Sequence, residues 1–197
     1  RSASELPLRM VPLAVTISAP ESSTVSVRTG AGDVKVNGRA GRTFARTGSG
    51  DVRIGKIDGD ADVATGSGHV DLDIISGGGR VRTGSGSIAI AGLQGPANIT
   101  SSSGAITLGE VSGDLTLRSG TGSVRVDDAK SGSFQIATGS GELILRVHPG
   151  VTAELDLSTG SGRAHSDLPV SPTRPPTDPE LVIRGRTGSG DVLVTRA

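Results

Sequence analysis

The chain has 197 residues, with 20 basic and 20 acidic side chains, no cysteine, and phenylalanine as its only aromatic residue type, present twice. Balanced charge removes the electrostatic argument for binding nucleic acid or an anionic membrane surface. The absence of cysteine excludes disulfides and thiolate metal sites, and no apolar run approaches the ~20 residues of a membrane span. We therefore expect a single domain with no nucleic-acid partner and no membrane span in this chain.

Residues 1–24 are expected to form an N-terminal cap. Four apolar residues alternate with others in a segment that ends at Pro20; they are Val11, Leu13, Val15 and Ile17. Such alternation predicts a strand, which we place over the N-terminal end of the fold. Because the chain opens at Arg1 rather than Met, we also expect that an upstream segment has been removed, with which a targeting signal could have been lost.

Residues 25–165 repeat a Thr-Gly-Ser-Gly motif, at first every eighteen residues. The motifs begin at Thr29, Thr47, Thr65, Thr83, Ser101 and Ser119 and then, after longer spacings, at Thr138, Thr159 and Thr187. Apolar residues stand two positions before and five and seven positions after these starts, so they alternate with polar residues as strands require. A fixed period indicates a stack of like units.

Each unit is predicted to contain two short strands, a bend at Gly-Ser-Gly and a shorter return closed by glycine. Such a unit cannot bury its inner residues alone, so we predict an all-β, single-stranded parallel β-solenoid with coils of eighteen residues. Roughly nine coils at one strand spacing each make a rod of about 40 Å. We ascribe the glycines of the bend to positive φ angles, which residues with a Cβ avoid.

The C-terminal part is predicted to hold a loop and a last coil. Residues 166–180 contain five prolines and cannot keep a β ladder, while residues 181–197 return as a final coil. Nothing in the sequence closes that coil, so its strand is expected to be an unpaired edge. The candidate self-association edge is Asp191, Val192, Leu193 and Val194. We expect a homo-oligomer through this edge, which Asp or Pro at Leu193 should abolish.

Three more specific interpretations of the bend motif are disfavoured by the sequence: a calcium site, a hexapeptide solenoid and an ice-binding face. Calcium-binding repeats need convergent oxygens at every site, but the position after the bend changes from Asp51 to His69 and then Ser87. Left-handed hexapeptide solenoids need an apolar residue every six, and Asp58 and Ser76 break that rule. Stacked Thr and Ser resemble an ice-binding face, yet local backbone bonding explains them already. We predict no metal and no cofactor.

Charged and nucleophilic residues do not form a recognisable site in the sequence. Arginines precede many bends, at Arg28, Arg46, Arg82, Arg118 and Arg186. They could bind an anionic surface polymer, but acidic residues lie near them in sequence, so a solvated mixed-charge edge is favoured. The three histidines occupy different positions of the repeat and no acid–base constellation converges. We name no catalytic residue; a carbohydrate-active β-helix enzyme is the minor alternative.

Five segments together resemble a known family. They are VSVRTGAGDVKV, TGSGDVRI, IDGDADVATGSGHVDL, EVSGDLTLRSGTGSVRV and VIRGRTGSGDVLVTRA. In this pattern the chain is similar to the DUF4097 adhesin-like, β-strand-repeat proteins of bacteria. The resemblance covers nearly the whole chain and implies a right-handed solenoid, a bacterial source and an association with cell-surface or envelope-stress proteins. It implies no defined catalytic or binding residues.

The sequence thus favours a non-catalytic scaffold or interaction protein that displays a rigid rod. Two hypotheses stay open: an adhesin-like or envelope-sensing module that binds a surface polymer or protein, and a structural element that assembles end to end. The cell envelope or exterior is the favoured location, although the cytoplasm stays open because the fold needs no disulfide.

Overall fold

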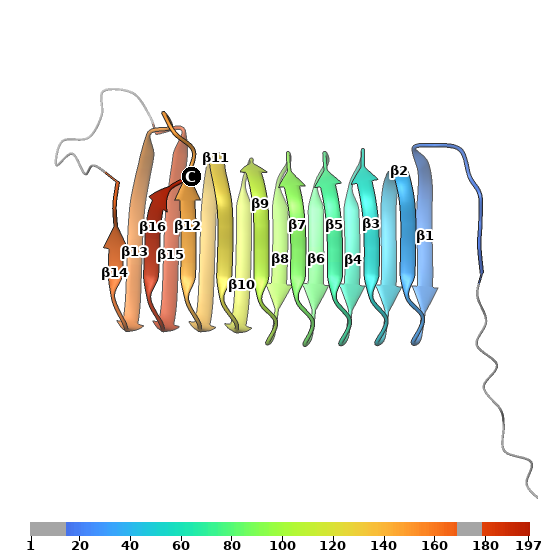
Figure 1. Cartoon of the computed structure of the whole chain (residues 1–197), viewed down its shortest axis with the longest axis horizontal. Coiled ribbons are helices and arrows are strands. Elements are labelled where there is room, and N and C mark those ends of the chain that lie inside the picture. Colours follow the sequence, from blue (N-terminus) through green and yellow to red (C-terminus); the bar gives the residue numbers. More distant parts are fainter. Residues whose placement is uncertain (1–14, 169–178) are drawn as a thin grey trace, which may run out of the picture.

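The computed structural model describes residues 15–168 and 179–197, and throughout these ranges the regular structure is strand. The strands stack side by side into an elongated solenoid (Figure 1). In chain order they are β1 (Ser23–Thr29), β2 (Val34–Thr47), β3 (Val52–Ile57), β4 (Ala61–Thr65), β5 (Val70–Ile75), β6 (Gly79–Thr83), β7 (Ile88–Leu93), β8 (Ala97–Ser101), β9 (Ile106–Ser112), β10 (Leu115–Thr121), β11 (Val124–Ser140), β12 (Leu143–Val147), β13 (Ala153–Ser161), β14 (Ala164–Ser166), β15 (Leu181–Ser189) and β16 (Val192–Arg196). No helix in the described part is long and apolar enough to cross a membrane.

The strands form two long faces, and all their pairings are parallel. Face A runs in the spatial order β1, β2 (residues 43–47), β4, β6, β8, β10, β11 (residues 134–140), β15 and β13. Face B runs in the order β2 (residues 34–40), β3, β5, β7, β9, β11 (residues 124–131), β12, β16 and β14. Because β2 and β11 turn a corner, they contribute to both faces. The predicted parallel β-solenoid is confirmed.

Aliphatic side chains fill the interior between the two faces. Successive coils place Val63, Val81 and Ile99 in one column, and each of these is fully buried. The alternation of the strands causes this, since every second residue points inward. Burying one such side chain contributes about 1.5–3 kcal/mol. Of the two aromatic residues, Phe134 points inward and is buried, whereas Phe44 points outward from face A and is half-buried.

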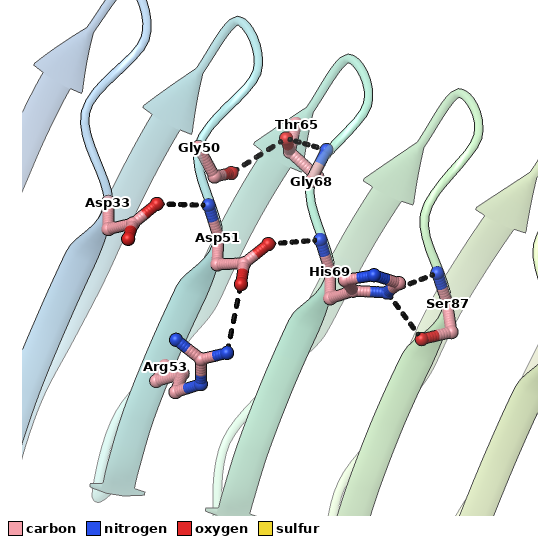
Figure 2. A network of polar contacts seen from close by, with 8 residues as sticks. All are labelled: Asp33, Gly50, Asp51, Arg53, Thr65, Gly68, His69 and Ser87. Carbon is pink, nitrogen blue, oxygen red and sulfur yellow. Dashed lines mark hydrogen bonds and ion pairs between the residues drawn. The ribbon is translucent and has the colours of Figure 1, made fainter.

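The Thr of each bend ties two coils together. The Thr65 hydroxyl accepts a hydrogen bond from the Gly68 N–H at 3.0 Å and donates one to the Gly50 carbonyl at 3.2 Å (Figure 2). Thr47 and Thr83 repeat this arrangement. The buried hydroxyl therefore has two backbone partners, which offsets the cost of removing it from water.

The reason for glycine in the regular bends differs from the one predicted. Gly68 and Gly86 do not have positive φ, although Gly141 and Gly190 in the later bends do. At Gly86 a Cβ atom would lie 1.8 Å from the carbonyl oxygen of Gly68 in the preceding coil. Close approach of coils, rather than a special backbone conformation, therefore excludes side chains from the regular bends.

The C-terminal coils are not stacked in sequence order. β15 pairs with β11 on one side and with β13 on the other, and β16 lies between β12 and β14. The last segment of the chain is thus inserted between two earlier ones, and the C-terminus lies beside β12 inside the stack (Figure 1). The end of the solenoid is formed by residues 153–166 instead. The prediction that the final strand is an unpaired edge is wrong, because β16 has a neighbouring strand on each side.

The described part of the predicted N-terminal cap, before β1, lacks the expected strand. Residues 15–20 contain no strand, and Val15 and Ile17 are 70% and 83% exposed. This segment extends away from the solenoid (Figure 1). Their apolar side chains alternate, but they have no neighbouring strand to pair with in the described structure. Val11 and Leu13 lie outside the described residues, as do residues 169–178 of the Pro-rich segment.

Candidate functional site

A column of polar side chains follows the bends on the side of face B. Asp33 Oδ1 accepts a hydrogen bond from the Asp51 N–H at 2.9 Å, and Asp51 Oδ1 accepts one from the His69 N–H at 2.9 Å. His69 Nδ1 continues the column, 3.2 Å from the Ser87 nitrogen and 2.7 Å from its hydroxyl (Figure 2). These side chains join successive coils through the backbone. Their chemistry is therefore used to hold the stack together.

Acidic residues at a second corner do the same. Asp60 Oδ1 accepts a hydrogen bond from the Gly78 N–H at 2.9 Å, and Asp114 Oδ1 accepts one from the Ser133 N–H at 3.0 Å. The Gly78 N–H, with the Arg42 guanidinium, holds the pKa of Asp60 below its ordinary value. The His69 N–H, with Arg53, lowers the pKa of Asp51 in the same way.

We expect acid to weaken the solenoid through these carboxylates. A lowered folded-state pKa means that the stabilisation is complete above the ordinary aspartate pKa of about 3.9 and is lost as pH falls through the lowered pKa. The melting temperature, measured by circular dichroism from pH 6 to pH 2, should fall below pH 4. The double variant Asp51→Asn, Asp60→Asn keeps one acceptor oxygen at each position for the backbone N–H. Neither amide can titrate, so the melting temperature of this variant should fall less. An identical fall in both proteins would contradict this assignment.

The charged residues of face B and its adjoining corner are mostly paired. Asp127 lies 2.6 Å from Arg125 and 3.6 Å from Arg146, and Arg53 lies 2.8 Å from Asp51. Nearby, the Lys130 ammonium lies 2.8 Å from Glu110. Further ion pairs in this region are Lys56–Asp58 and Lys130–Asp128, and His148 Nδ1 lies 2.9 Å from Asp128 Oδ1. This side of the rod therefore presents neutralised charge to solvent.

Face A carries unpaired arginines. Arg82 on β6, Arg118 on β10 and Arg186 on β15 are exposed, and none lies within ion-pair distance of a described acidic residue. These three residues, here called the arginine row, occupy every second strand of the face. Two strand spacings separate consecutive members, which is about 10 Å. The row therefore presents positive charge at a regular interval.

The neighbours of the arginine row are small or polar. Thr100 lies between Arg82 and Arg118, and Ala137 lies between Arg118 and Arg186. Arg80 on β6 and Arg184 on β15 lie on the same face, opposite Asp62 on β4 and Asp156 on β13. A shallow groove of about 500 Å³ beside Arg80 is lined in part by Asp60, Asp62 and Asp114. No outward position of face A between β6 and β15 carries an acidic residue in the described structure.

Comparison with known proteins assigns the family. The model of one family, described as Toastrack DUF4097, matches residues 13–195. The chain belongs to the Toastrack family. No curated protein and no solved structure matches the chain. The Toastrack domain and its solenoid fold fit a non-catalytic repeat scaffold, in agreement with the resemblance seen in the sequence.

The predicted association edge of this Toastrack chain lies inside the stack. Val192 and Val194 are buried, Leu193 is half-buried on the outer side of face B, and Asp191 Oδ1 accepts a hydrogen bond from the Arg163 N–H at 2.9 Å. Since neighbours cover β16 on both sides, these four residues offer no free ladder to a partner. Association itself stays a prediction, and its place must be another strand.

Sequence reasoning also underrated the arginines of the Toastrack solenoid. Of the acidic residues near them in sequence, Asp51, Asp71 and Asp73 lie at the bend or on face B, whereas Asp62 lies on β4 of face A, 3.8 Å from Arg46. Arg80 and Arg184 were missed because they stand two positions before the aligned arginines. The alternation of the strand places both members of each pair on the same face.

Proposed function

We propose that this Toastrack domain is an adhesin-like binding module of the bacterial cell envelope or surface, and that face A binds a linear anionic polymer. The observation that carries the proposal is the arginine row, three exposed guanidinium groups about 10 Å apart on a flat sheet. Guanidinium groups bind carboxylate and phosphate groups through paired N–H donors. A rigid rod holds them in place, so that little side-chain and backbone order is lost on binding.

The contrast between the two faces supports this assignment. Arginines of face B, such as Arg125 and Arg146, already contact Asp127, so a polymer would have to displace an existing ion pair there. The arginine row has no such competitor in the described structure. Outward Asn98, Thr116 and Gln135 lie among the arginines of face A and can donate hydrogen bonds to the same ligand.

The test compares two triple variants with equal charge change. Arg82→Ala, Arg118→Ala, Arg186→Ala removes the arginine row. The matched control changes Arg53, Arg125 and Arg146 of face B to alanine. An exposed ion contact contributes about 0.2–1 kcal/mol, so losing all three contacts should weaken binding by about 3-fold to 100-fold, and the control should bind as the wild type does.

Binding is measured by biolayer interferometry with polygalacturonate as a carboxylate polymer, polyphosphate as a phosphate polymer and dextran as a neutral one. The wild type should bind at least one polyanion, more weakly as salt rises, and should not bind dextran. Preference between the two polyanions identifies the anionic group. Equal loss in both triple variants, or no binding to either polyanion, would refute a ligand site on face A.

A further inference from the structure

The solenoid ends in an open edge on both sides in the described structure. At one end β13 pairs only with β15 and β14 only with β16; at the other end β1 pairs only with β2. The inward apolar residues of these terminal coils are only half-buried. They are Leu155 and Leu157 at one end and Val25 and Val27 at the other. Each end thus exposes unused backbone groups beside an apolar stripe, which is a template for another chain.

We propose that the protein assembles head to tail, with residues 153–166 of one copy stacked on residues 23–36 of the next. The partner is a second copy of this chain because the strands of the two edges belong to the same columns of the solenoid and have the same polarity. Both contain the Thr-Gly-x-Gly bend, at Thr29 and at Thr159. A head-to-tail contact leaves the same two ends free after each addition, so the product is an open filament.

The register of the contact follows from the columns of the solenoid. Leu155 and Val25 occupy the same column through the strands between them, and so do Leu157 and Val27. Stacking in this register covers all four half-buried side chains. It also matches the bends of the two copies, so that Thr29 of the second copy lies over Thr159 of the first.

Backbone groups at the two ends also match in this register. Within the stack, each bend Thr donates to a carbonyl of the preceding coil, as Thr159 does to Gly190 at 3.0 Å. Thr29 has no preceding coil in the part of the chain that the structure describes, so its hydroxyl can donate to the Gly162 carbonyl of another copy. Likewise, the Val192 N–H donates to the Arg163 carbonyl, and the Ala164 N–H can donate in the same manner to an Asp33 carbonyl.

Charges at the two ends are complementary. Arg163 and Asp33 stand at the same position of the repeat, so the backbones that carry these opposite charges come to lie one strand spacing, about 4.8 Å, apart across the contact. Asp156 of the first end comes diagonally opposite Arg28 of the second. His165 comes to lie over Lys35, and the Asp167 carboxylate, 2.7 Å from His165 Nε2, brings a negative charge close to that ammonium group.

Gly30→Ala separates assembly from folding. A Cβ at Gly30 meets nothing within 4 Å in the single chain. At the equivalent positions Gly48, Gly66 and Gly84, which have a coil beneath them, the added Cβ would lie 2.3 to 2.4 Å from a carbonyl oxygen. In a filament Gly30 would be in the same situation, over the Gly160 carbonyl. The substitution should therefore block stacking without disturbing the monomer.

The experiment is light scattering over a concentration series with electron microscopy of the same samples. The wild type should increase in mass with concentration and form rods longer than one chain, whereas Gly30→Ala should stay monomeric with the wild-type melting temperature. A wild type that is monomeric at every concentration, or a Gly30→Ala variant that associates equally well, would overturn the proposal.

Arg163→Glu provides an independent variant, because the Arg163 side chain is exposed and makes no ion pair in the described structure. It would place two carboxylates together at the contact with Asp33. We expect it to shift association to at least about tenfold higher concentration, since like charges in contact are destabilising. If Gly30→Ala also proved less stable, unchanged association of Arg163→Glu would refute the head-to-tail contact.

Discussion

Gly84→Ala is expected to destabilise the solenoid by about 3 kcal/mol or more. The new Cβ would lie 2.4 Å from the Gly66 carbonyl oxygen, a separation that no relaxed structure allows. Strand pairing fixes the distance between the two coils, so the strain can be relieved only by opening hydrogen bonds on both sides of the bend. In a chain of this length, such a loss lowers the melting temperature by roughly 6–12 °C.

The control for this prediction is Gly30→Ala, which makes the same change at the same position of the repeat. Since nothing lies within 4 Å of its Cβ, its melting temperature should remain within about 2 °C of the wild type. Calorimetry at a concentration where both proteins are monomeric measures the difference. Similar melting temperatures for the two variants would mean that coil spacing does not explain the glycines.

Val194→Asp is expected to have a comparably large effect, with Leu193→Asp as its neighbour and control. Val194 is fully buried and its strand is paired on both sides, so a carboxylate there must either lose its water or force the coil apart. The expected cost is about 3 kcal/mol or more. Leu193 points outward from face B, and Asp at that position should cost less than about 1 kcal/mol.

Chemical denaturation of both variants tests the inserted position of the last coil. An unpaired strand at the end of the rod could detach alone, so Val194→Asp would then leave the main unfolding transition unchanged. That result would contradict the insertion between β12 and β14. Leu193→Asp should also leave self-association unchanged, because the proposed contact lies at residues 153–166 and 23–36. This differs from what the sequence alone predicted for that position.

The sequence predicted the architecture because each coil repeats the same pattern. Columns such as Val63, Val81 and Ile99 specify which residues point inward, and the period specifies parallel stacking in register. The order of the last coils was not predictable in this way. Residues 143–147, 164–166 and 192–194 are short segments of similar pattern, so local periodicity does not determine which of them pair. Because residues 181–197 come last in the chain, the sequence favoured placing them at the end of the stack, which is wrong.

The proposed binding surface was harder to predict for a related reason. Sequence distance placed Asp71 close to the arginines, whereas the bend separates the two faces and leaves the arginine row unpaired in the described structure. Likewise, the alternation at Val15 and Ile17 predicted a strand, but residues 15–20 form none and have no neighbouring strand in the described structure. Alternation shows that a segment can pair; it does not show that an adjacent edge is in reach.

The insertion of β15 and β16 sets an order of events during synthesis. Residues 153–166 leave the ribosome before residues 181–197, yet the later segment must lie between them and β11–β12. While the chain is still growing, the earlier coils can stack one after another as they emerge. The final two coils cannot take their native places until the end of this segment has been released. A chain interrupted before that point therefore lacks the strands that separate β13 from β11 and β14 from β12 in the finished fold.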